Sequence, residues 1–198
     1  MLDRLDSLAS NTSLTIEWDL ERAIDLMESL RDAGYPITTL VKRYGSSKSE
    51  YILASLAFFV AGHPGEGVGS GQTPPAFLLV EKLAGVDQPT VVDLCLSALH
   101  REIILGENTS AVLPPAASDL VMRALEFSGD QAWIVYTSGL NLLEGLCSHD
   151  TLRSSFSEGQ IESLKRSVAR IRDLKTVNLR EDAEAVLECL RGDMTRFK

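Results

Sequence analysis

Helix-start signals recur along this chain about every 40 residues, and this spacing restricts the possible folds more than any other feature of the sequence. A first series begins at intervals of 39, 40 and 43 residues, near Pro36, Pro75, Pro115 and Glu158. A second series follows it at intervals of 40, 43 and 48 residues, near Lys48, Gln88, Gln131 and Leu179. Proline suits the first turn of a helix, because the N–H that it lacks has no partner there. The alternation of the two series predicts four pairs of helices.

Apolar residues recur at helical spacing, and no stretch has the sustained alternation that is typical of a strand. In the first long segment Thr12 or Ser13 is placed to cap a helix and Gly34 to end it. One face of this helix is apolar and consists of Ile16, Leu20, Ala23, Ile24, Met27 and Leu30. With this segment and the four pairs, we expect nine good helices, one or two further turns within 149–156, and no strand.

Capping boxes predict where three of these helices begin, at residues 47–50, 157–160 and 178–181. The helix that follows the first box, Tyr51–Ala61, is apolar on every side. A helix of this kind belongs in the centre of a fold. We therefore expect Tyr51–Ala61 to be the most buried helix of the protein.

A helix-pair repeat near 40 residues resembles HEAT and armadillo arrays, in which stacked pairs share one continuous core. The resemblance rests on spacing and helix ends, since the pairs share little sequence beyond Gly-Asp-Gln turns. It implies an all-α HEAT-like α-solenoid of about four helix pairs, forming one domain over 1–198. Residues 1–35 would be the N-terminal cap and residues 36–191 the repeats. The alternative is an irregular helical bundle, which would contain a similar number of helices.

Composition excludes several classes of protein. The chain of 198 residues has 28 acidic and 19 basic side chains, a formal net charge of −9. Binding to nucleic acid or to an anionic membrane needs a basic surface, so we expect neither. The longest nearly apolar stretch has 11 residues, whereas about 20 are needed to span a bilayer. With no signal-peptide pattern at the N-terminus, we expect a cytoplasmic location.

The three cysteines, Cys95, Cys147 and Cys189, have no metal-ligand or redox spacing. Each lies in an apolar helical pattern, which predicts buried free thiols.

Catalytic chemistry finds little support in the sequence. The glycine-rich stretch 62–71 lacks the lysine of a phosphate-binding loop and follows a helix rather than a strand. His63, His100 and His149 have no second ligand at a recognised metal spacing. We therefore expect no enzyme activity, no catalytic residue, no metal and no cofactor.

A protein-binding surface is the function that the helix pattern predicts. In HEAT-like arrays the second helix of each pair lines the concave face, and its polar residues form stripes at helical spacing. Trp133 either packs in the core or acts as an aromatic anchor of this surface. The mixture of aromatic and acidic side chains suits a basic protein partner. The candidate binding residues are Tyr51, Asp93, Ser97, His100, Arg101, Trp133, Thr137, Asn141, Glu144, Glu184 and Glu188.

In size, charge and architecture the chain resembles immunity proteins of bacterial contact-dependent inhibition and related polymorphic toxin systems. This resemblance implies a non-catalytic protein that binds and neutralises a cognate toxin domain. Many toxins of these systems are nucleases, whose active-site faces are basic. No diagnostic motif carries it, so no family residue is transferred. One alternative is a helical-repeat adaptor or assembly factor within a larger complex. Another is a helical enzyme or lyase that uses His100 or His149.

Overall fold

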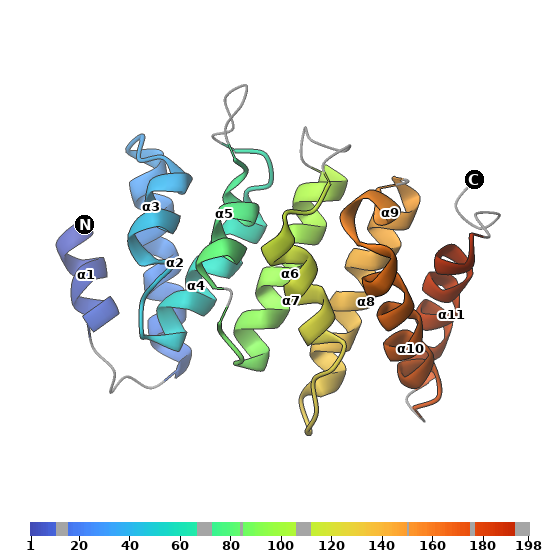
Figure 1. The fold of residues 1–198 in the computed structure, drawn as a ribbon. Helices are drawn as coiled ribbons and strands as arrows, with labels where there is room; N and C mark the ends of the chain where they lie inside the picture. Colours follow the sequence, from blue (N-terminus) through green and yellow to red (C-terminus); the bar gives the residue numbers. More distant parts are fainter. Residues whose placement is uncertain are drawn as a thin grey trace.

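The computed structural model describes residues 1–10, 16–66, 73–83, 85–105, 112–149, 151–174 and 177–192, which are helical and contain no strand. The all-α prediction is confirmed for this part of the chain (Figure 1). The helices are α1 (Leu2–Ser10), α2 (Ile16–Asp32), α3 (Ile37–Tyr44), α4 (Glu50–Gly62), α5 (Pro75–Lys82), α6 (Pro89–Leu105), α7 (Pro115–Ala124), α8 (Ala132–Ser148), α9 (Leu152–Ser155), α10 (Glu158–Arg172) and α11 (Val177–Arg191).

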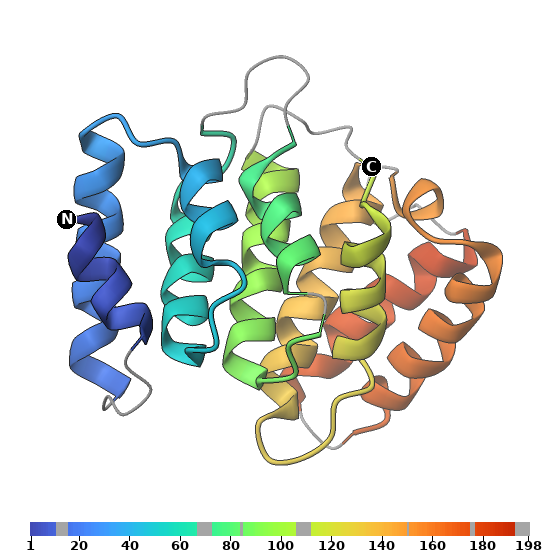
Figure 2. The ribbon, with the colours of Figure 1, turned by 60° about the vertical axis from the view of Figure 1, so that its left-hand side comes forward.

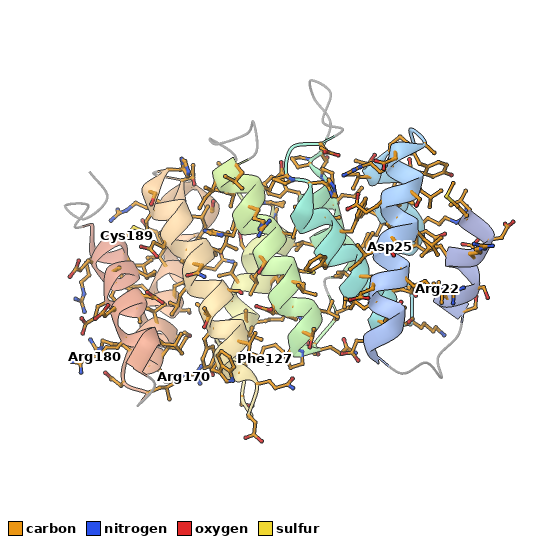
Figure 3. All side chains as sticks on the ribbon, turned by 180° about the vertical axis from the view of Figure 1, so that it is seen from behind. Arg22, Asp25, Phe127, Arg170, Arg180 and Cys189 are labelled. Carbon is orange, nitrogen blue, oxygen red and sulfur yellow. A yellow bond between two sulfur atoms is a disulfide. The ribbon has the colours of Figure 1, made fainter. Side chains whose placement is uncertain are left out.

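The helices form two layers that run the length of the molecule. Helices α2, α4, α6, α8 and α11 pack side by side in chain order and make one layer, which faces the viewer in Figure 3. Helices α3, α5, α7 and α10 make the other layer, again in chain order (Figure 2). The first and last helices lie at opposite ends of this row (Figure 1).

Polar contacts between different helices join residues that lie one helix pair apart in the sequence. Among the side-chain hydrogen bonds that join one helix pair to the next, the separation ranges from 32 residues, between Arg31 and His63 at the end of α4, to 45, as between Asp93 and Ser138. The other side-chain hydrogen bonds between described helices, and the disulfide below, fall within the same range. Each helix pair therefore contacts its immediate neighbours along the row.

Most predicted helix ends are confirmed. Gly34 has a φ of +85° beyond the end of α2, in the left-handed region that glycine adopts without strain. Pro36, Pro75, Pro89 and Pro115 lie at or just before the first residues of their helices. The caps proposed for the first long helix, Thr12 and Ser13, lie outside the described residues.

One capping box is confirmed and two are wrong. The hydroxyl of Ser157 accepts a hydrogen bond from the backbone of Gln160, whose side chain accepts one from the backbone of Ser157. At the first site Ser49, not Ser47, is the N-cap and accepts from the backbone N–H of Ile52. Helix α11 begins at Val177, so Asn178 lies within it and is not its cap.

The core is continuous between the two layers, and α4 is the helix with the largest share of buried residues. Leu56 is fully buried in it. Phe58 is the exception on this helix, because it points away from the core and is 51% exposed. The prediction that α4 is the most buried helix is confirmed for the described part of the chain.

Two features were not predicted. Helix α1 has only Leu5 and Leu8 as buried residues, too few to show a pattern in the sequence. Cys147 of α8 and Cys189 of α11 form a disulfide with their Cα atoms 6.2 Å apart, so the prediction of three free thiols is wrong for this pair. Spacing alone could not reveal this bond, because the packing of α11 against α8 brings the two sulfurs together. Cys95 is a buried free thiol, as predicted.

Candidate protein-binding surface

The two layers differ in net charge. The layer of α2, α4, α6, α8 and α11 contains 14 Asp and Glu residues and five Arg, a formal net charge of −9. The helices α3, α5, α7 and α10 contain four acidic and eight basic residues, a formal net charge of +4. We call the first set the acidic layer. All eleven candidate binding residues belong to its helices.

Asp93 and Ser97 lie at the contact between α6 and α8. The hydroxyl of Ser138, on α8, donates a hydrogen bond to Oδ1 of Asp93. It also lies 3.5 Å from the hydroxyl of Ser97. Burial raises the pKa of Asp93, while the hydrogen bond from Ser138 lowers it. Asp93 and Ser97 are half-buried, and their contacts with Ser138 link α6 to α8.

His100 also packs against α8. A β-carbon placed on Gly145 would lie 3.2 Å from Cδ2 of His100, so the glycine leaves room for the ring. Burial and the neighbouring Arg101 lower the pKa of His100. The histidine is half-buried between two helices, and its ring fills a helix–helix contact.

Arg101 of α6 and Phe58 of α4 are exposed. The Arg101 guanidinium donates to the carbonyl oxygen of Ala61 on α4, over 3.4 Å. Tyr51 begins the same face of α4 and packs its half-buried ring against the core. Ser55, one turn later, is buried and bonds to the carbonyl oxygen of Tyr51, so it takes no part in the exposed surface.

Four candidate residues follow one another along α8. Trp133 is 56% exposed, so its assignment to the core is wrong. Thr137, Asn141 and Glu144 continue the stripe at helical spacing and are partly exposed. The Thr137 hydroxyl bonds to the carbonyl oxygen of Trp133. The structure thus places an exposed aromatic side chain and a carboxylate on one face of α8.

Glu184 and Glu188 extend the surface onto α11, where both are partly exposed. Arg180 donates to Oε1 of Glu184 over 3.3 Å. At the opposite end of the layer, Arg22 and Asp25 are exposed on α2 (Figure 3). The acidic layer therefore carries partly or fully exposed charge on both of its end helices.

A polar cluster that the sequence did not predict, buried at Glu102 and partly exposed at Arg31 and Glu28, joins α2, the end of α4 and α6. Glu102, one residue from Arg101, is 2% exposed and accepts a hydrogen bond from the backbone of Gly65. His63 donates from Nδ1 to the carbonyl oxygen of Phe59 and receives Arg31 at Nε2. Arg31 also pairs with Glu28 at 3.0 Å. The run His100-Arg-Glu102 looks uniformly polar, so the burial of Glu102 had no signal in the sequence.

The described residues hold no group of three or more His, Cys, Asp or Glu side chains placed to bind a metal ion. In the same part of the chain, no helix is both long and apolar enough to cross a bilayer. The stretch 62–71, considered above as a binding loop, lies partly outside the described residues.

No protein-family model matches the chain, and neither a curated protein nor a solved structure matches it. Its function is therefore inferred from the geometry and charge of the chain alone.

Proposed function

We propose that this chain is a non-catalytic binding protein with a HEAT-like α-solenoid fold, whose acidic layer binds a basic protein partner. Its most specific form is an immunity protein that neutralises a cognate bacterial toxin domain in the cytoplasm. The separation of charge between the two layers is the observation that carries the proposal.

The solenoid is supported by the range of the contacts. In a stacked repeat each unit contacts only its neighbours, so tertiary contacts span about one repeat length. The polar contacts between neighbouring helix pairs span 32 to 45 residues, a range that overlaps the 39- to 48-residue intervals between helix starts. An irregular bundle has no reason to restrict its contacts in this way.

The binding role is supported by the composition of the surface. Trp133 and Phe58 are aromatic side chains that remain more than half exposed on the acidic layer. Exposed aromatic residues often supply most of the binding energy at protein interfaces. The carboxylates of the same layer favour a basic partner, because complementary charge steers the encounter and excludes acidic competitors. A nuclease toxin would meet this requirement, because an active-site face that binds nucleic acid is positively charged.

The proposal is tested with a toxin-like open reading frame that adjoins the gene of this protein. Cells that express the toxin domain should grow only when this chain is co-expressed. The purified domain should bind this chain, and the association rate constant should fall steeply as salt rises, because mobile ions screen exposed charge beyond about 8 Å at physiological ionic strength.

A pair of double variants separates the surface from net charge. Glu144→Lys with Glu184→Lys reverses two carboxylates of the acidic layer, and Asp119→Lys with Glu162→Lys makes the same charge change on α7 and α10. We expect the first pair to slow association at least about tenfold, and the second to change it less than about twofold. Equal effects would contradict binding at the acidic layer. If co-expression of this chain does not protect cells from the toxin domain, the immunity role is contradicted. If the chain instead binds a basic protein that is not a toxin, the alternative role as an adaptor is favoured.

A further inference from the structure

A hollow of about 450 Å³ opens beside α10, on a helix outside the acidic layer. Its walls come from the turn after α7 and from one side of α10. This is the region where Arg170 approaches the residues before Phe127 in Figure 3. The lining residues are Glu126, Ser163, Arg166, Ser167 and Arg170.

The four α10 residues of the hollow lie on one face of the helix, because their spacing of three, four and seven residues brings them to the same side. A neighbouring face of α10 packs into the core through Leu164, Val168 and Ile171. The hollow therefore presents two guanidinium groups and two hydroxyl groups together. A volume of this size admits a small molecule but not a folded segment.

The two arginines are held in place without a carboxylate partner. Arg170 donates from Nη2 to the carbonyl oxygen of Leu125, and Arg166 donates from Nη2 to the hydroxyl of Ser163 over 3.1 Å. Within the described part of the chain neither guanidinium forms an ion pair. The neighbouring cations of α10 do so, Lys165 with Glu162 at 2.6 Å and Arg172 with Asp173 at 2.9 Å. The unpaired charge of the helix is thus concentrated in the hollow.

We propose that this hollow binds a phosphate monoester of a small, hydroxyl-bearing molecule. A phosphate has three terminal oxygens and accepts from guanidinium forks and hydroxyl groups at once, whereas a carboxylate offers only two oxygens. Ser163 accepts from Arg166 and keeps its own O–H proton for a ligand. Glu126 can only accept hydrogen bonds when ionised, so it disfavours a bare anion and suits the hydroxyl groups of the ester's carbon body.

The test uses the full chain, with glycerol 3-phosphate and inorganic phosphate as probes in isothermal titration calorimetry at constant ionic strength. We expect saturable binding of both, with the ester bound more tightly. Arg166→Gln should weaken binding of the ester at least about tenfold, because one charged donor pair is lost. Lys165→Gln is the matched control, since it removes one charge from the same helix outside the hollow, and it should change the affinity less than about twofold.

A third variant tests the carboxylate. Glu126→Gln should tighten the binding of inorganic phosphate, because a negative charge leaves the hollow, and should reduce the preference for the ester. Absence of saturable binding of either probe at about 10 mM would overturn the proposal. Equal losses in Arg166→Gln and Lys165→Gln would overturn it as well, since they would assign any binding to diffuse positive charge. Circular dichroism of each variant checks that the helices are retained.

Discussion

The backbone N–H of Gly65 donates a hydrogen bond to Oε2 of Glu102 over 3.0 Å, although the two residues are 37 positions apart. This bond ties the turn after α4 to a carboxyl group inside α6. The second carboxyl oxygen, Oε1, is buried and has no hydrogen-bond partner within the described residues. Burial raises the pKa of Glu102, and the bond from Gly65 opposes the rise.

Glu102 should therefore make the protein less stable as pH rises. A carboxyl whose pKa is raised by folding binds its proton more strongly in the folded state, so its ionisation favours unfolding above the ordinary Glu value of about 4.5. In Glu102→Gln this dependence is absent, while the amide oxygen still accepts from Gly65. We expect the free energy of unfolding of the variant, relative to the parent, to increase from pH 4 towards neutral pH. Urea titrations across this range measure it, and a constant difference would contradict the prediction.

Leu56 should be essential to the core between the layers. It is fully buried in α4, so Leu56→Ala should lower the free energy of unfolding by about 2–5 kcal/mol. Phe58→Ala is the matched control on the same helix, because this ring is 51% exposed and should cost well under half as much. Denaturant titrations compare the two variants. Similar losses would mean that α4 does not present these faces as described.

The disulfide between Cys147 and Cys189 should stabilise the packing of α11 against α8. Cross-linking residues 42 positions apart restricts the unfolded chain, and a loop of this length corresponds to about 4 kcal/mol in the chain-entropy treatment. Dithiothreitol should lower the unfolding free energy of the parent and of Cys95→Ala, which retains the bond. It should leave Cys147→Ala unchanged. If Cys147→Ala responds to the reductant like the parent, the assigned pair is wrong.

A second consequence of this disulfide concerns location. Disulfides persist in oxidising compartments and are rare in a reducing cytoplasm. In the proposed cytoplasmic setting we expect the two thiols to be reduced in cells, with packing of α8 against α11 holding the helices together. Alkylation of freshly lysed cells followed by mass spectrometry distinguishes free from bonded cysteines.

Trp133 should matter for binding and not for folding. Because the side chain is 56% exposed, Trp133→Ala should change the unfolding free energy by less than about 0.5 kcal/mol. If the acidic layer binds the partner, the same variant should weaken the complex by about 2 kcal/mol or more, as expected of an aromatic anchor. Calorimetry with the purified partner measures the loss. An unchanged affinity would remove Trp133 from the interface.

Asp6 should hold α1 against α3. Its carboxylate accepts from Arg43 and from the Tyr44 hydroxyl, and these hydrogen bonds lower the pKa of Asp6. The contribution of a carboxyl with a lowered pKa is complete above its unfolded value and is lost as pH falls through the folded one. Asp6→Asn should therefore speed amide hydrogen exchange in α1, with Asp3→Asn as the control. Because the pair is exposed, global stability should change little.

The sequence predicted the parts of the fold that depend on local interactions. Proline at Pro75 and Pro115 restricts the backbone, and glycine at Gly34 permits the left-handed conformation that ends a helix. Both effects are local, so these residues mark helix ends without reference to the rest of the chain. The interval between helix starts follows from these marks. The apolar surface of α4 predicted its burial for a similar reason, since no orientation of such a helix leaves only polar groups in water.

The tertiary structure decided what each polar residue does. Helical spacing places Asp93, His100 and Arg101 within one polar stretch, yet α8 covers the first two and leaves Arg101 exposed. Glu102 is buried and Trp133 exposed, the reverse of what their side chains alone suggest. A helix determines which residues share a face, but only its neighbours determine whether that face meets water. The charged layers and the Cys147–Cys189 bond arise in the same way, because both depend on which helices lie side by side.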